Sequence, residues 1–161
     1  MGKVLTNFKN GYPGAVSRSA DTVIISMRNA SEGSIPFGAP VFLVSGENAC
    51  RGFDSAASSS ENFIGIAVRA ADRTPETYGS NEAEYLPNDP VDILVRGSTV
   101  LSFDSAAVVG SSVYIRKSDG KTVTSAGAEG TTVLLENVKI KTPQTANRPC
   151  SEAVVISRNI Q

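Results

Sequence analysis

Phe63-Ile-Gly-Ile-Ala-Val-Arg69 and Val91-Asp-Ile-Leu-Val-Arg-Gly97 are two apolar runs, and the stretch 70–90 between them is rich in proline, tyrosine and carboxylates. Short runs rich in β-branched residues and bounded by turn residues favour strands over helices. Connections between strands have a median length of about 4–6 residues, so this loop is unusually long. Its aromatic and turn-forming residues are untypical of a disordered linker. We therefore expect two strands joined by a long ordered loop that contacts another molecule.

The same strand-like pattern continues outward along the chain. Further short runs occur at 22–27, 40–44, 99–103, 112–117, 131–138 and 153–158, with a short ninth candidate at 121–124. Between 117 and 121, Asp119-Gly120 predicts a hairpin turn, because glycine accepts the positive φ that tight turns require. Arg96-Gly97-Ser98 is either a break between two strands or a bulge in one. The pattern predicts an all-β fold, a single-domain β-barrel or jelly-roll-like sandwich.

The 161 residues fit one domain. Asn10-Gly-Tyr-Pro-Gly14 sets a tight bend near the start of the chain. We therefore expect residues 1–20 to form an extended N-terminal arm and residues 21–161 a β-barrel domain that carries the long loop 70–90. Such an arm packs either on its own barrel or on a neighbouring molecule, and the sequence leaves both alternatives open.

Composition excludes several classes of function. The chain has no histidine, which removes the commonest general base and metal ligand, and its formal net charge of −1 without basic clusters argues against a nucleic-acid partner. No apolar run approaches the roughly 20 residues that span a bilayer, so we expect no membrane partner. Cys50 and Cys150 cannot form a zinc site alone, and we expect free thiols in a reducing compartment. Whether the two cysteines pair cannot be read from the sequence.

Carboxylates are the remaining catalytic candidates. They cluster in or beside the long loop at Glu76, Glu82, Glu84, Asp89 and Asp92. Two carboxylates can act as a general acid and base, as in glycosidases, but nothing in the sequence buries or pairs them. We interpret them as a solvated charged loop. We expect no enzyme activity, no cofactor, no metal and no small-molecule substrate.

Several motifs taken together resemble a known family. They are Gly11-Tyr-Pro-Gly-Ala-Val-Ser-Arg18, Ile35-Pro-Phe-Gly-Ala-Pro-Val41, Phe63-Ile-Gly-Ile-Ala-Val-Arg69, Tyr78-Gly-Ser80, Tyr85-Leu-Pro87, Pro90-Val-Asp-Ile-Leu-Val-Arg-Gly97 and Ser157-Arg-Asn-Ile160. In this order they resemble the capsid cement, or decoration, proteins of tailed bacteriophages. The resemblance runs from about Gly11 to Ile160, and each motif alone is weak.

The resemblance implies a structural protein with no catalytic residues. It would bind the outer surface of an icosahedral head, bridge major capsid proteins, and act as a homodimer or homotrimer. It would be assembled in the host cytoplasm and reside in the virion. The contact candidates are Tyr12, Pro13 and Arg18 in the arm, with Thr74, Tyr78, Tyr85 and Pro87 in the long loop.

Two other functions remain open from the sequence. One is a β-rich ligand-binding or adhesin module on a virion surface, which would need a cluster of exposed aromatic residues on one face. The other is a carboxylate-based hydrolase, which would need two carboxylates within roughly 5–10 Å of each other in a cleft.

Overall fold

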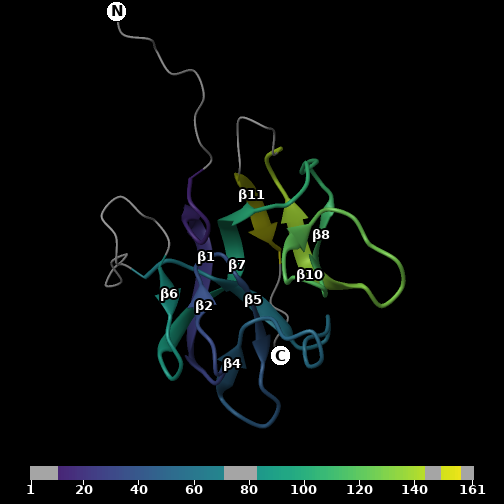
Figure 1. Cartoon of the computed structure of the whole chain (residues 1–161). Coiled ribbons are helices and arrows are strands. Elements are labelled where there is room, and N and C mark those ends of the chain that lie inside the picture. Colours follow the sequence, from purple (N-terminus) through teal and green to yellow (C-terminus); the bar gives the residue numbers. More distant parts are fainter. Residues whose placement is uncertain (1–10, 71–82, 144–149, 157–161) are drawn as a thin grey trace, which may run out of the picture.

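The structure, a computed structural model, describes residues 11–70, 83–143 and 150–156, and these residues contain strands but no helix (Figure 1). In chain order the strands are β1 (Val16–Asn29), β2 (Ile35–Pro36), β3 (Pro40–Leu43), β4 (Ala49–Arg51), β5 (Phe63–Ala67), β6 (Glu84–Tyr85), β7 (Pro90–Ser102), β8 (Ser112–Arg116), β9 (Thr122–Val123), β10 (Thr132–Ile140) and β11 (Cys150–Val155). The predicted all-β fold is confirmed.

Five strands close a barrel. The order is β1-β4-β3-β5-β7, and β7 pairs back with β1 to complete the ring. Inside lies the first hydrophobic core, to which Val41, Ile64, Val91, Ile93 and Val95 contribute. The two-stranded ribbon β2–β6 adds Ile35 and Tyr85 to the same core. The barrel therefore has its own apolar interior.

The same nine-stranded sheet continues beyond the barrel. The order of this extension is β7-β11-β10-β8-β9, so β7 belongs to both the barrel and the extension. In Figure 1 β7 lies between β1 on one side and β11, β10 and β8 on the other. A second hydrophobic core combines residues of β8, β10 and β11 with Phe42, Phe63, Ile66 and Leu94 from the barrel strands.

The strand β5 shows why the central sequence is apolar on both faces. Phe63 and Ile66 belong to the second core, whereas Ile64 and Ala67 belong to the barrel core. Side chains alternate across a strand, and the register shift between Phe63 and Gly65 displaces this alternation by one residue. A strand between two cores therefore needs apolar residues at consecutive positions. The apolar run of β5 therefore forms the wall between the two cores.

Gly97 allows the single strand β7 to belong to both the barrel and its extension. The chain does not break here, as one of the two predictions had it, but bends within one strand, with a φ of 125° at Gly97. The pairing of β1 with β7 is irregular opposite this point, between Arg18 and Val23. A Cβ at Gly97 would lie 3.0 Å from Oγ1 of Thr22, so glycine allows the two strands to approach.

Other local predictions have mixed outcomes. The Asp119-Gly120 hairpin is confirmed, with φ 70° at Gly120 and antiparallel pairing of β8 and β9. Residues 16–20, assigned to the arm from sequence, form the start of β1 instead, because they pair along β7. Residues 1–10 and most of the long loop, 71–82, lie outside the described residues. Cys50 and Cys150 are both buried free thiols.

Candidate interaction surface

The turn at Tyr12–Ala15 is fixed to one end of the barrel by backbone hydrogen bonds. Gly14 N donates to Val100 O at 2.9 Å, and Val100 N donates to Ala15 O at 3.0 Å. On the other side, Arg69 N donates to Gly14 O at 2.9 Å. Because these bonds reach β7 and the end of β5, the turn that follows residues 1–10 has a defined position.

Two glycines make this position possible. Gly14 and Gly38 have φ values of 77° and 81°, which only glycine adopts without strain. A Cβ at Gly14 would lie 2.7 Å from Gly38 N, and one at Gly38 would lie 2.7 Å from Pro13 Cβ. The turn therefore packs backbone against backbone on the segment between β2 and β3.

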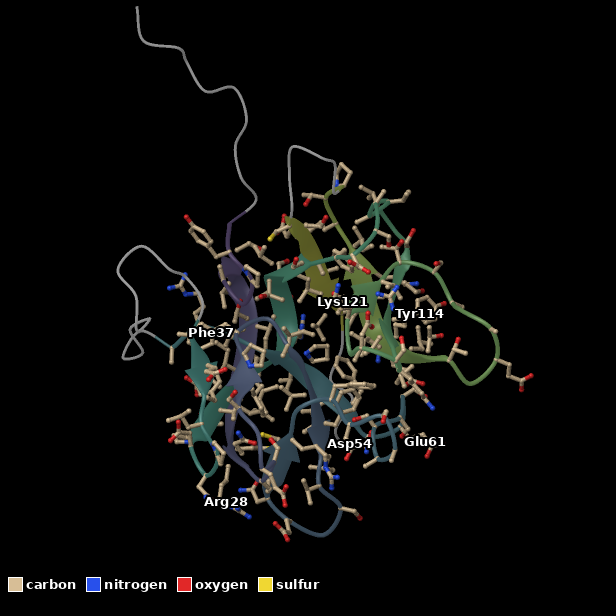
Figure 2. All side chains as sticks on the ribbon, in the orientation of Figure 1. Arg28, Phe37, Asp54, Glu61, Tyr114 and Lys121 are labelled. Carbon is tan, nitrogen blue, oxygen red and sulfur yellow. The ribbon has the colours of Figure 1, made fainter. Side chains whose placement is uncertain are left out.

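An arginine lies between aromatic rings at the same place. The guanidinium carbon of Arg69 is 6.0 Å from the centroid of the Tyr12 ring and 5.8 Å from that of Phe37. Phe37 meets Tyr85 edge to face, with centroids 5.3 Å apart. A cation over aromatic faces contributes roughly 0.5–1 kcal/mol at exposed sites. We call Tyr12, Phe37 and Arg69 the aromatic platform; Figure 2 places Phe37 on the side of the molecule where β6 lies.

The platform lies where the chain enters both segments named in the sequence analysis. Tyr12 follows residues 1–10 after Gly11, and Arg69 precedes residues 71–82 by one residue. Ala70 and Ala83, which flank 71–82, both pack against the barrel core, and Phe37 N donates to Ala83 O at 3.1 Å. The described residues that border 1–10 and 71–82 therefore lie close together at one place, which we call the base of these two segments.

The predicted contact residues fall in different environments. Tyr12 is 45% exposed, Pro13 is half-buried against Gly38, and Pro87 is exposed. Arg18 pairs through its backbone with Ser98, and its side chain is outside the description. The remaining loop candidates, Thr74 and Tyr78, lie outside the described residues.

Tyr85 is a correction to the contact set. Its side chain is 1% exposed, and its hydroxyl donates to Val68 O at 2.6 Å. A side chain with this burial offers no surface to a partner, so we assign Tyr85 a supporting role beneath the platform. The apolar core of the barrel takes up its ring, which the loop-like sequence around it did not indicate.

Two loops expose apolar residues at their tips, and the sequence analysis did not identify them. Val108 and Val109 are 63% and 57% exposed in the loop between β7 and β8, and Gly110 N fixes this loop by donating to Ile140 O. Leu86 is 54% exposed in the turn between β6 and β7, where its N donates to Asp89 Oδ2. Adjacent valines before a glycine were the available signal for the first tip.

The described carboxylates of the long loop have local partners. Glu84 accepts a hydrogen bond from Ser34 at 2.6 Å, and Asp92 accepts one from Ser26 at 2.5 Å. These carboxylates therefore act as turn and strand supports.

Among the described residues no group of three or more histidine, cysteine or carboxylate side chains could hold a metal ion. None of the described residues forms a helix able to cross a membrane.

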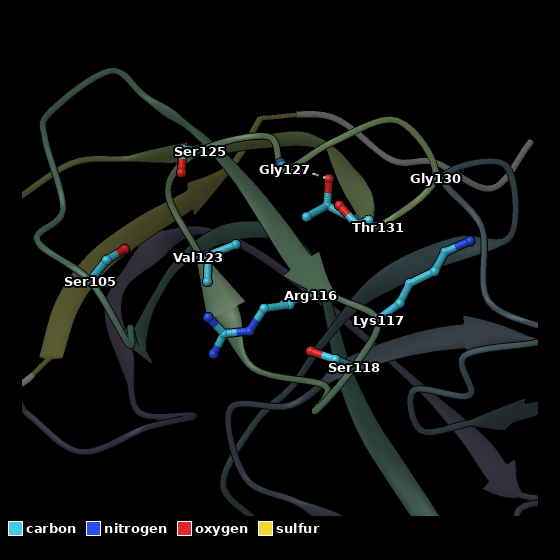
Figure 3. A pocket seen from close by; sticks show the side chains of 10 residues that line it. Ser105, Arg116, Lys117, Ser118, Val123, Ser125, Gly127, Gly130 and Thr131 are labelled. Carbon is cyan, nitrogen blue, oxygen red and sulfur yellow. Dashed lines mark hydrogen bonds between the residues drawn. The ribbon is translucent and has the colours of Figure 1, made fainter.

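An open depression of about 620 Å³ lies over the β8–β9 hairpin, lined among others by Ser105, Arg116 and Thr131 (Figure 3). The guanidinium of Arg116 contacts Asp104 and Asp119, each at 2.6 Å. Hydrogen bonding to Arg116 lowers the pKa of both carboxyl groups, and it raises the pKa of Arg116. Arg116 is thus already bound to two carboxylates, and we interpret the cluster as a lock on the hairpin.

The chain matches one family model and resembles two solved structures. The family model described as structural cement protein (E217 gp24/Pam3 gp6) matches residues 2–157. A chain in the capsid of Myoviridae phage XM1 is 18% identical, with a TM-score of 0.70, covering 96% of this chain and 95% of that one. The base of head fibre gp8.5 of bacteriophage phi29 is 11% identical, with a TM-score of 0.41 over 87% of this chain and 98% of that one. No curated protein matches the chain.

Proposed function

The chain belongs to the family of structural cement proteins of bacteriophage capsids, and we propose that it grips the major capsid protein through the aromatic platform and the segments that begin there. The protein is a structural component of the virion that decorates the capsid. Membership of this family implies a non-enzymatic role. The proposal adds the outer surface of the head as its location and adjoining capsid proteins as its partners.

The observation that carries the proposal is the fixed base shared by two segments. Arg69 and Tyr12 lie together at the points where the chain enters 71–82 and leaves 1–10. Tyrosine and arginine are enriched at protein interfaces and among the residues that contribute most of the binding energy. A rigid base also limits the conformational entropy lost when the protein docks. Tyr12, with 45% of its surface exposed, is the central anchor we propose.

Self-association is part of the same proposal. Closed symmetric oligomers are the common form of such assemblies, and a shell offers two-fold and three-fold positions. Many identical contacts of modest strength then add up through multivalency. We propose a homodimer or homotrimer on the capsid, with no nucleic acid or membrane partner.

The test is decoration of capsids prepared without this protein. We expect Tyr12→Ala to weaken binding by about tenfold or more, as truncation of an interface hot spot does. Deleting residues 1–10 should weaken it further, while the barrel keeps its melting temperature. Co-sedimentation with capsids measures occupancy against protein concentration.

Leu134→Ala is the matched control. Leu134 is an exposed apolar residue in β10, 37% exposed, and lies outside the platform. It should decorate capsids as the parent does. If Tyr12→Ala and the deletion both bind with the affinity of the control, the platform is not the contact surface.

A further inference from the structure

Among the described residues, one edge of β1 has no strand paired with it along most of its length. β1 pairs with β7 along one edge, whereas on its other edge β4 pairs only with Arg28 and Asn29. Within the described ranges, no strand pairs with that second edge between Val23 and Met27. An edge of this kind is a template for an additional strand, because its backbone groups can pair with another chain.

The composition of this edge is unusual for one exposed to solvent. Its sequence is Val23-Ile-Ile-Ser-Met27, rich in β-branched residues and without proline, glycine or lysine. Ile24 is 44% exposed, and Val23, Ile25 and Met27 only partly cover the barrel core. Proteins usually protect an edge with lysine, proline or a bulge, and here the last register shift lies between Val23 and Ile24, so the edge from Ile24 to Met27 is regular. A flat apolar edge without protection is expected to be covered in the functional assembly.

The chain itself contains a segment suited to cover it. Residues 3–9 read Lys-Val-Leu-Thr-Asn-Phe-Lys, in which Val4, Thr6 and Phe8 share one face of a strand. Those β-prone side chains match the partly covered face formed by Val23, Ile25 and Met27. Ten extended residues reach roughly 33 Å, more than the roughly 17–20 Å of an ordinary strand. Residues 1–10 are therefore long enough to span the edge.

The position of Gly11 indicates which molecule supplies the segment. A Cβ at Gly11 would lie 3.3 Å from Cγ2 of Val100 in β7, and Gly14 is bonded to Val100 and Arg69. The segment therefore starts on the β7 side of β1, whereas the unpaired edge faces away from β7. A second copy can approach that edge directly, without crossing the barrel end.

We propose that residues 3–9 of a second copy add a strand to the edge of β1 between Val23 and Met27. This inference extends the self-association proposed above and names its surface. Residues 3–9 then contact a second copy, and loss of decoration on deletion of residues 1–10 follows from the lost oligomer. Tyr12→Ala leaves residues 1–10 in place and tests the capsid contact of the platform separately, so failure of this inference leaves that contact standing.

The first experiment measures the oligomeric state of the chain alone by light scattering after size exclusion. The parent should form a concentration-dependent oligomer. Deletion of residues 1–10 should abolish it, and Ile24→Lys should do the same, because a lysine on an exposed edge opposes strand addition. Leu134→Lys, a matched change at an exposed residue of β10, should leave the oligomer intact. A parent that is monomeric at every concentration would overturn the proposal.

The second experiment identifies the partner strand. A Val4→Cys chain carrying a mass tag is mixed with an untagged Ile25→Cys chain under mild oxidation, because Val4 and Ile25 would lie on the same face of the added strand and β1. We expect a disulfide-linked species with the summed mass of the two chains, lost when residues 5–9 are replaced by glycine and serine. A chain carrying both substitutions should also link between copies. If that double variant links only within its own chain, the segment covers its own barrel and the proposal is wrong.

Discussion

Replacing Tyr85 by phenylalanine separates support of the platform from contact with a partner. The substitution keeps the ring that meets Phe37 and removes only the hydroxyl that donates to Val68 O at 2.6 Å. A buried carbonyl left without its donor costs roughly 1–3 kcal/mol, and no cavity is created because the ring volume is kept. We expect the free energy of unfolding to fall by about 2 kcal/mol. For a chain of this size, the melting temperature should fall by about 4–8 °C.

Tyr114→Phe is the control for the loss of a hydroxyl. Tyr114 lies half-buried in β8, and its hydroxyl makes no hydrogen bond within the described part of the chain. This variant should unfold within about 0.5 kcal/mol of the parent. Urea denaturation, with the slope compared between variants, measures both changes. If Tyr85→Phe is as stable as Tyr114→Phe, the bond to Val68 contributes nothing and the reasoning fails.

Capsid binding and folding stability should be lowered by different substitutions. Tyr85→Phe leaves the exposed surface unchanged and should decorate capsids with the parental affinity at a temperature where it is folded. Tyr12→Ala should bind weakly yet unfold close to the parent, because Tyr12 is 45% exposed. If Tyr85→Phe loses binding without losing stability, then Tyr85 acts at the interface and not beneath the platform.

Gly65→Ala should destabilise the chain by about 1–3 kcal/mol, the usual cost of overpacking, because a Cβ there would lie 2.2 Å from Leu94 O; chemical denaturation measures it. Burial raises the pKa of the Cys50 thiol from its ordinary 9.0 to about 11, so thiol labelling at pH 8 should run about 100-fold slower in the native than in the urea-unfolded chain. Hydrogen bonding to Arg116 depresses the pKa of Asp119 below 3.8, so its stabilisation is present above that pH and lost as the pH falls through the native pKa. Unfolding curves of Asp119→Asn and the parent should therefore differ at pH 6 and converge in stronger acid.

The strands that alternate or run apolar were predictable, and β9 was indicated by its hairpin turn, whereas the short strands β2, β4 and β6 were not predictable. Phe63–Ala67 and the two halves of β7 carry enough apolar residues to identify themselves. The strands β2, β4 and β6 have two or three residues each, and no periodicity can be read from so few. Their positions depend on pairing with distant strands, as β6 depends on β2. Such pairing is set by tertiary structure and not by local propensity.

The contact residues show the same limit. Tyr12 is 45% exposed, as a contact residue must be, and its role at a capsid stays a prediction. Tyr85 was chosen for the same chemical reason, yet it is buried, because β6 places it over the barrel core. A tyrosine suits an interface and a core equally well, since its ring is apolar and its hydroxyl needs one partner. Sequence gives the chemistry of the side chain, and only the fold gives the direction in which it points.

The glycines explain why the segments share one base. Gly14 and Gly38 touch through their backbones, so the Tyr12 turn cannot pivot on the barrel without breaking the bonds to Val100 and Arg69. Two segments that start from one rigid point act as linked binding modules, and binding of one raises the effective concentration of the other. A mobile base would reduce this gain in effective concentration, because each segment would then lose conformational entropy separately when it docks. Substituting either glycine should therefore weaken capsid binding more than the loss of any single exposed side chain, since it disturbs both segments together.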